Sequence, residues 1–164
     1  MTQKTVGLYF SSFWDNIAAL PPGGGLLKRY RKALRHKANP RTEAYMHALL
    51  AETFPGASFV NVAAGPDWHE AARQADVIVL LYPDATGIGF SAVERQASCL
   101  MSPWAERRVL NGRRRDFLLN GPTRWSLRLR RWLEISMLGE FAFLGLFLVV
   151  TPGLLAIDWA RGRR

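Results

Sequence analysis

The sequence has almost no cysteine. Cys99 is the only one among 164 residues, which excludes an intramolecular disulfide and fits a reducing compartment. The N-terminal stretch MTQKTVGLYFSSFWD also lacks a secretory signal, because its apolar run of five residues is too short for the signal's apolar core. We therefore expect the N-terminal part of the protein to stay in the cytoplasm.

Patterns that bind metals or nucleoside triphosphates are lacking as well. His36, His47 and His69 are isolated, with no second ligand at metal-binding spacing, so we predict no metal site. The glycine-rich residues 21–25 precede Lys28 without the spacing or the Ser/Thr of a Walker A loop. The chain has no internal repeat and no low-complexity tract. Its 49% hydrophobic content is ample for a packed core, so global disorder is not expected.

Positive charge is abundant and unevenly placed. The formal net charge is +9. Residues 28–41 (KRYRKALRHKANPR) carry seven Lys and Arg and no acid, and all twelve basic residues after residue 102 are arginine. Two basic segments on an otherwise ordinary chain indicate a polyanionic partner, which is a membrane surface, a nucleic acid or a phosphorylated ligand.

Hydrophobic periodicity predicts alternating strands and helices in the first hundred residues. Apolar runs at residues 5–10, 57–65 and 76–83 predict strands, and the six consecutive apolar residues of the third are typical of a central parallel strand. Helical patterns lie between and after these runs. We predict an α/β fold, a small doubly wound (flavodoxin- or Rossmann-like) sheet of three to four parallel strands plus a hairpin, in a cytoplasmic domain of residues 1–119.

A turn signal interrupts the basic stretch that follows. Within residues 105–119, Asn111 and Gly112 lie between two strand-like arms, and an Asn-Gly pair in that setting favours a type I′ hairpin. The arginines that come directly after this pair are expected to face the membrane surface. The predicted loop therefore has two residues.

The last third of the chain has the composition of a membrane-attached segment. Residues 120–138 predict an amphipathic interfacial helix, residues 139–160 a membrane segment and residues 161–164 a basic tail. Seventeen uncharged residues separate Glu140 from Asp158, which as a helix would span roughly 25 Å of the ~30 Å hydrocarbon core. The side chains expected at the membrane surface are Arg113, Arg114, Arg115, Arg124, Trp125, Arg128, Arg131, Trp132 and Trp159.

Arginine is more abundant before the apolar segment than after it. Nine arginines lie between residues 107 and 131 and three follow residue 159. This bias favours a spanning helix in the inner (cytoplasmic) membrane, with the N-terminal domain on the cytoplasmic face. A re-entrant segment and a buried core helix are the alternatives. Nucleic-acid binding is less favoured, because the tryptophans lie beside an apolar span and not on a sheet.

Polar residues and glycines follow two of the predicted strands. Doubly wound folds bind ligands at the carboxyl edge of the sheet, which would bring the loops after the first and third strands together. Glycines permit close backbone approach, and a helix that begins near Ser91 could offer amides to a phosphate. The alternative is that the glycines only form the strand-to-helix turn. The candidate ligand-binding residues are Ser11, Ser12, Asp84, Thr86, Gly87, Gly89 and Glu94.

These two loops resemble those of flavodoxin-like proteins, including the flavin reductases of that fold. In that family a serine-bearing loop after the first strand holds phosphate, and the loop after a strand like ADVIVLLYP borders the flavin. By this resemblance, which covers about 90 residues, the corresponding positions are Ser11, Ser12, Asp84, Thr86 and Gly87. The order of Asp84, glycine and Glu94 also resembles that of nucleoside deoxyribosyltransferases, with a longer spacing. Neither resemblance assigns a cofactor or a catalytic residue.

The sequence says more about location than about chemistry. We expect a membrane-anchored accessory subunit that positions or stabilises a larger membrane enzyme, in the metabolism of lipid-linked or nucleotide-activated sugars of the cell envelope. Its expected partners are the lipid bilayer and that larger protein. The alternative is a membrane-tethered enzyme that binds a nucleotide or a flavin at the carboxyl edge of the sheet.

Overall fold

The computed structural model describes residues 3–21, 25–65, 67–100, 102–136 and 138–162, which fall into two compact units. The first unit ends at Arg128 and the second begins at Leu129. The elements of the chain are β1 (Thr5–Tyr9), α1 (Ser12–Ala18), α2 (Leu26–Ala38), α3 (Glu43–Thr53), β2 (Ser58–Asn61), the 3-10 turn η1 (Val62–Ala64), α4 (Trp68–Arg73), β3 (Val77–Tyr82), α5 (Ser91–Leu100), β4 (Glu106–Asn111), β5 (Asp116–Leu118), α6 (Gly121–Ser136) and α7 (Leu138–Ala160).

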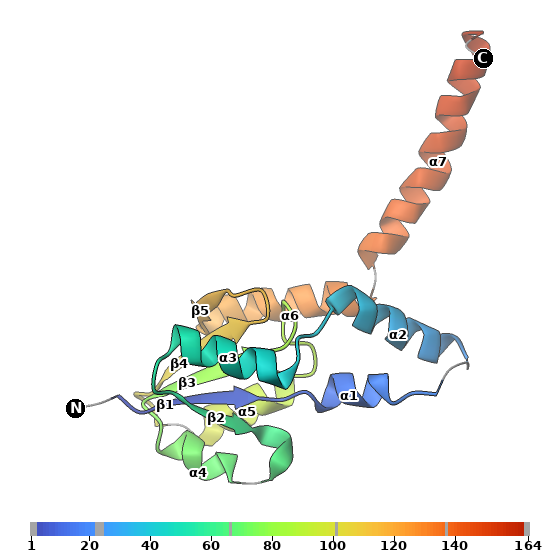
Figure 1. Ribbon diagram of the computed structural model, residues 1–164. Helices are drawn as coiled ribbons and strands as arrows, with labels where there is room; N and C mark the ends of the chain where they lie inside the picture. The colour runs from blue at the N-terminus through green and yellow to red at the C-terminus, as the bar shows by residue number, and fades with distance from the viewer. Residues whose placement is uncertain (1–2, 22–24, 66, 101, 137, 163–164) are drawn as a thin grey trace. The chain divides into compact units, whose positions relative to one another are not determined.

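The first unit is built on a five-stranded mixed sheet with the order β2-β1-β3-β4-β5 (Figure 1). The strands β2, β1, β3 and β4 run parallel to one another, and β5 is antiparallel to β4. The α/β class is therefore confirmed. The predicted hairpin is not an addition to the parallel sheet, however, because its first arm, β4, is the fourth parallel strand.

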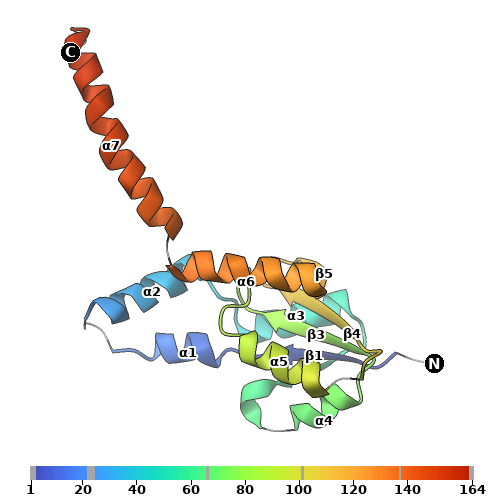
Figure 2. The same cartoon turned by 180° about the vertical axis from the view of Figure 1, so that it is seen from behind.

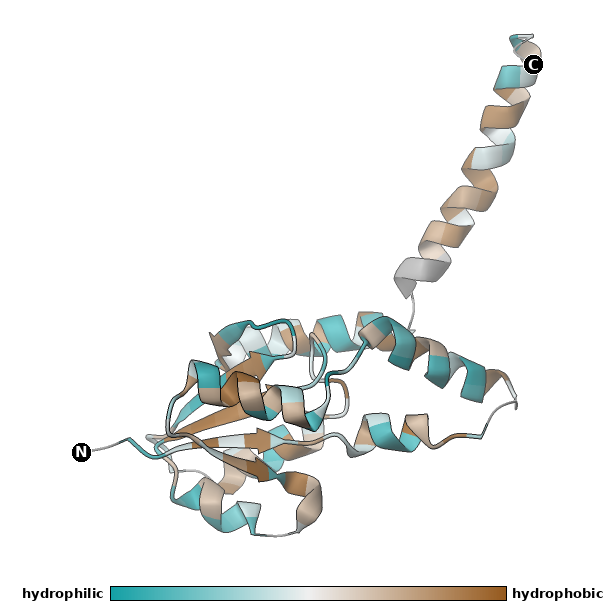
Figure 3. Ribbon diagram, viewed as in Figure 1, coloured by the Kyte–Doolittle hydropathy of each residue, from teal (hydrophilic) through white to brown (hydrophobic). Residues whose placement is uncertain are grey.

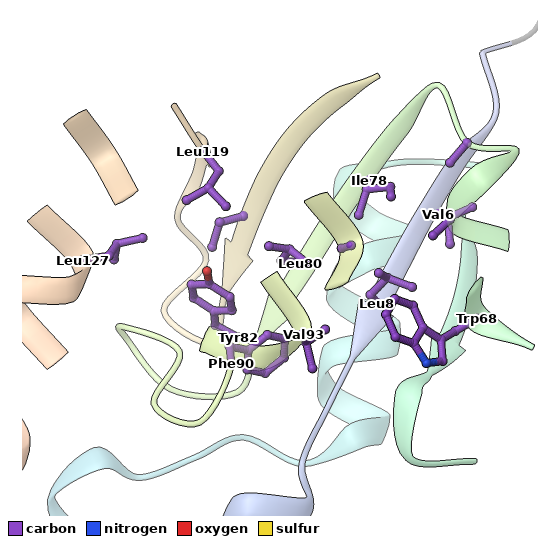
Figure 4. Packing of buried hydrophobic residues seen from close by; sticks show 14 residues of the cluster. Val6, Leu8, Trp68, Ile78, Leu80, Tyr82, Phe90, Val93, Leu119 and Leu127 are labelled. Atoms are coloured by element: carbon purple, nitrogen blue, oxygen red, sulfur yellow. The ribbon is translucent and has the colours of Figure 1, made fainter. Parts of the chain in front are cut away.

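Helices cover both faces of the sheet, as Figures 1 and 2 show from opposite sides. Alternate residues of β1 and β3 point to opposite faces. Leu8, Ile78 and Leu80 pack with α4, α5 and Leu127 of α6 in one cluster, which Figure 4 shows in close view. On the other face, Val79 and Leu81 pack with three side chains of α3, namely Met46, Leu49 and Leu50. This two-sided burial explains the unbroken apolar run of β3.

A third, smaller cluster joins α1 to α2. Trp14 and Ile17 of α1 are buried against Leu34 of α2 and Ile88. The sequence did not predict α1, because the polar stretch after β1 indicated a loop. The seven residues of α1 carry no side-chain cap hydrogen bond, so the contacts of Trp14 and Ile17 are what hold it.

The turn between β4 and β5 differs from the predicted type I′ loop. A type I′ turn needs positive φ at both central residues, but Gly112 is not among the residues with positive φ, whereas Arg114 has φ 61°. The backbone amide of Asn111 donates to the carbonyl of Arg115, at 3.0 Å, and the side chain of Asn111 accepts from the amides of Arg113 and Arg115. A longer loop, organised by the buried side chain of Asn111, therefore replaces the Asn-Gly turn.

The second unit consists of the last turns of α6 and the whole of α7. Within α7, Ala142–Ala160 has a mean hydropathy of 1.9, and none of it is buried against the rest of the protein. At the rise of an α-helix, the 23 residues of α7 measure about 34 Å, and the helix continues through Pro152. Figure 3 shows hydrophobic residues along its length. Of the helices in the described ranges, this one alone is long and apolar enough to cross a membrane.

Candidate functional site

Asp84 organises the loop that follows β3. Its carboxylate is buried and accepts hydrogen bonds from the Trp14 indole, at 3.2 Å, and from the backbone amides of Thr86 and Ile88, at 2.7 and 3.0 Å. The amide of Gly87 donates to the same carboxylate. The negative charge is thus compensated by N–H groups of the protein itself.

The amides of this loop are therefore directed inward. A phosphate-binding loop presents consecutive N–H groups to an external anion, but here those of Thr86, Gly87 and Ile88 bind the carboxylate of Asp84. The carboxylate occupies the role that we expected a ligand phosphate to have. The hydrogen bond from the amide of Thr86 to the carboxylate of Asp84 therefore helps to hold the loop.

The two glycines of the loop are required by internal packing. Gly87 has φ +71°, and a Cβ there would lie 2.6 Å from the Tyr82 ring. Gly89 has φ +90°, and its Cβ would lie 2.8 Å from the Cβ of Phe13. Neither side chain can be accommodated without moving an aromatic residue. Positive φ and close packing therefore account for both glycines within the strand-to-helix turn.

Glu94 lies on the first turns of α5, beneath the loop. It is 5% exposed, and it accepts a hydrogen bond from the hydroxyl of Tyr82. Tyr82 and Phe90 are packed together in the main core (Figure 4). Glu94 joins α5 to the end of β3 and is not among the residues that line the neighbouring pocket.

A polar pocket of about 240 Å³ lies at the carboxyl ends of β1 and β3. Tyr9 ends β1 and Pro83 directly follows β3. The backbone amide of Arg41 donates to the carbonyl of Pro83, at 2.7 Å, which brings the α2–α3 connection to the sheet edge. The lining residues are Tyr9, Ser11, Trp14, Asp15, Arg35, Pro40, Arg41, Thr42, Glu43 and Pro83.

Hydroxyl and carboxylate groups line one part of this pocket. The hydroxyl of Ser11 donates to the carboxylate of Asp15 and is also hydrogen-bonded to Tyr9. Burial raises the pKa of Tyr9 above its ordinary value of 10.0, and the negative charges of Asp15 and Glu43 add to this effect. Glu43 in turn accepts a hydrogen bond from Asn61, at 3.0 Å. At neutral pH the phenol is protonated and can donate to a ligand.

Two arginines provide positive charge to the same pocket. Arg35 belongs to α2 and Arg41 to the connection before α3, and both are exposed. Within the ranges that the structure describes, neither guanidinium forms an ion pair, although Arg41 lies 5.4 Å above the Tyr45 ring. A second hollow of about 60 Å³ continues past Arg41 to Gly112 and Arg113. The pocket can therefore bind an anionic group beside hydroxyls.

Only part of the predicted site is at this pocket. Ser11 lines it, and Asp84 lines the smaller hollow, whereas Ser12, Thr86, Gly87, Gly89 and Glu94 line neither. The candidates from the sequence did not include four lining residues of the pocket, Tyr9, Arg35, Arg41 and Glu43. The position of Tyr9 as the last residue of the first strand was a usable signal. The sequence held no comparable signal for Arg35 and Arg41, because they belong to the basic segment 28–41, which was interpreted as a contact surface for a polyanion.

Most of the residues predicted at the membrane surface are exposed in the structure, and two are not. Exposed side chains are Arg113, Arg114, Arg115, Trp125, Arg128, Trp132 and Trp159. Arg114 is paired with Glu52, at 3.0 Å. Arg124 is half-buried and donates to the Ser98 hydroxyl, at 3.0 Å, and Arg131 is 5% exposed. Arg124 is therefore directed to Ser98, and Arg131 is buried, so neither is an exposed surface residue.

Metal ligands are not grouped in the described part of the chain. Among the residues that the structure describes, no group of three or more His, Cys, Asp and Glu is placed to hold a metal ion.

Known proteins provide no assignment for this site. No protein-family model, no curated protein and no solved structure matches the chain.

Proposed function

We propose that this protein is a membrane-tethered, doubly wound α/β domain that binds a small polar anion at the carboxyl edge between β1 and β3. The observation that carries the proposal is the position and lining of the 240 Å³ pocket. In the order β2-β1-β3-β4-β5 the direction of the connections reverses between β1 and β3. Open parallel sheets bind their ligands at such a point, outside the carboxyl ends of the strands.

The lining of the pocket favours a compact ligand with an anionic group and several hydroxyls. Arg35 and Arg41 suit a phosphate or carboxylate, whereas Asp15, Glu43 and Tyr9 suit hydroxyl groups. The volume lies below the range of about 300–1,000 Å³ that is common for drug-sized ligands. A phosphorylated sugar fits this description, and a flavin or nucleotide would extend beyond the cavity. We therefore propose a phosphorylated sugar as the ligand in preference to a nucleotide or a flavin.

Membrane attachment is the other half of the proposal. An apolar helix such as α7 suits a lipid environment, since its backbone groups are hydrogen-bonded within the helix except at its ends and at Pro152. Trp125 and Trp132 of α6 are 68% and 58% exposed, which suits side chains at the boundary between headgroups and hydrocarbon. The arginine bias of the sequence supports a cytoplasmic domain at the inner membrane.

Ligand-dependent thermal stabilisation of the full chain in lipid nanodiscs tests the binding proposal. The probes are inorganic phosphate, glucose 1-phosphate, glucose, uridine diphosphate glucose and flavin mononucleotide. We expect glucose 1-phosphate to stabilise most and glucose least. Arg35→Gln and Arg41→Gln should each weaken binding about 10- to 100-fold, the equivalent of about 1.5–3 kcal/mol for a charge-assisted hydrogen bond.

Arg73→Gln is the matched control, because Arg73 is exposed on α4 and lines neither hollow. It should leave the stabilisation unchanged. If none of the five probes stabilises the protein, or if all three variants respond alike, the pocket is not a binding site for a polar anion.

An accessory role in a larger membrane complex is a second candidate function. Trp104 is 92% exposed, in the connection between α5 and β4. Tryptophan is enriched among the residues that contribute most to protein–protein binding, so we propose Trp104 as a contact residue. A mild-detergent pull-down of the full chain should recover a membrane protein that the Trp104→Ala variant loses. Equal recovery by both forms would remove Trp104 as the contact.

A further inference from the structure

Helix α2 presents one apolar face to the protein and a face rich in cations to solvent. Tyr30, Leu34 and Ala38, spaced by four residues, pack in the cluster with α1. The remaining positions include the basic residues Lys28, Arg29, Arg31, Lys32, Arg35 and Lys37 and no acidic residue. Figure 3 shows this helix as largely hydrophilic. The inward face explains why α2 folds onto the domain but leaves the outward charge unexplained.

Three arginines of α2 have no acidic partner among the residues that the structure describes. In the described part of the chain, Arg29, Arg31 and Arg35 take part in no ion pair. Lys32 reaches only the backbone carbonyl of Pro21, at 3.4 Å. Like charges three and four residues apart on a helix repel one another. An external polyanion would remove this repulsion.

Two leucines at the start of α2 indicate which polyanion this is. Leu26 and Leu27 are 85% and 62% exposed, directly before the basic residues. Exposed aliphatic side chains next to cations are typical of helices that lie on a bilayer, where the leucines enter the acyl region and the cations reach the headgroups. Single-stranded nucleic acid is bound by stacking on aromatic rings, and the ring of Tyr30 is on the inward face.

We propose that α2 docks onto an anionic lipid surface, with Leu26 and Leu27 inserted and its arginines and lysines at the lipid phosphates. This contact is separate from the apolar helix α7 and orients the domain that α7 tethers. Arg35 belongs to both α2 and the polar pocket. Docking therefore places the pocket close to the headgroups. The proposal goes beyond ligand binding and is tested without any ligand.

A fluorescent label at position 27 tests the docking in the full chain. In a Cys99→Ser background, Leu27→Cys carries an environment-sensitive fluorophore, and Ala51→Cys, at an exposed position of α3, carries the same label as a control. The protein is placed in nanodiscs of neutral phosphatidylcholine or of phosphatidylcholine with 30% phosphatidylserine. We expect a blue-shifted emission at position 27 only in the anionic discs, and no change at position 51 in either.

Charge reversal distinguishes electrostatic docking from general contact with the disc. Arg29→Glu combined with Arg31→Glu should lower the docked fraction at least tenfold, because each cation near an anionic leaflet contributes to the attraction. Arg73→Glu combined with Arg95→Glu, on exposed positions of α4 and α5, is the matched control and should have no effect. Raising salt from about 0.05 to 0.5 M should undock the unmodified protein through screening.

Three results would overturn the proposal. The first is an unchanged emission at position 27 in anionic and neutral discs. The second is equal docking of the two double variants, provided that circular dichroism shows both to be folded. The third is a blue shift that appears only when RNA is added to neutral discs, which would make α2 a nucleic-acid contact.

Discussion

Removing the carboxylate of Asp84 should destabilise the first unit more than any other single change to a polar side chain in the loop after β3. In Asp84→Ala the Trp14 indole and the amides of Thr86, Gly87 and Ile88 lose their common acceptor. A buried donor left unsatisfied costs about 1–3 kcal/mol, and water entering the site offsets part of the sum. We expect a loss of roughly 3–5 kcal/mol, a large share of the ~5–15 kcal/mol typical of a domain.

Graded variants make this prediction specific. Asp84→Asn keeps one oxygen acceptor and should cost less than Asp84→Ala. Trp14→Phe removes one hydrogen bond and should cost least of the three, about 1 kcal/mol from that bond, plus its change in packing. Asp67→Ala is the control, because Asp67 is exposed and its side chain caps no amide. Its effect should stay within about 0.5 kcal/mol.

The assay is thermal unfolding of the full chain in nanodiscs, with circular dichroism as the signal. For a domain of this size, 1 kcal/mol shifts the Tm by about 2–4 °C, so Asp84→Ala should lower it by roughly 6–20 °C. A shift for Asp84→Ala no larger than that for Asp67→Ala would refute the reasoning, because the carboxylate would then have no role in holding the loop.

Two further predictions concern neighbouring residues. Gly87→Ala should lower the free energy of unfolding by about 2 kcal/mol or more, since the added Cβ meets the Tyr82 ring. Gly56 has φ +85° and open space around it, so Gly56→Ala should lose only about 1 kcal/mol, from backbone strain. Chemical denaturation compares the two variants, and equal losses would contradict the packing argument. Because burial raises the pKa of Tyr9 above 10.0, its stabilisation is complete below about pH 10 and lost as the pH rises through the folded pKa. Tyr9→Phe should therefore flatten the fall in stability above about pH 10, and an unchanged slope would show that Tyr9 is not the group responsible.

Periodicity predicted the strands that are buried on both faces, because such strands need unbroken apolar runs. Helical patterns were predicted between these strands, and α3 is one such helix, with the hydroxyl of Thr42 accepting from the amide of Tyr45 at its start. The fourth parallel strand was harder to recognise. Its first residues, Glu106 to Arg108, are charged and only partly buried, and only the end of the strand enters the core. Such a sequence is equally compatible with a hairpin arm.

The polar pocket lies at the sheet edge where the sequence placed its candidate site, but most of its lining residues were not among those candidates. The rule that ligands bind at carboxyl edges gave the location, including Ser11. It gave no means of knowing that the carboxylate of Asp84 points inward to its own loop, because this depends on the buried Trp14. Arg35 and Arg41 reach the edge only through the packing of α2 and the amide of Arg41 on Pro83. These are tertiary contacts that no local pattern encodes.

Arginine footprinting of the full chain in nanodiscs tests the central claim most directly. Phenylglyoxal modifies accessible guanidinium groups, and mass spectrometry measures the modification of each residue with and without glucose 1-phosphate. If the pocket binds a polar anion, the ligand should protect Arg35 and Arg41 at least severalfold and leave Arg73 unchanged. Full modification of Arg35 and Arg41 at saturating ligand, or equal protection of Arg73, would contradict a binding site between β1 and β3.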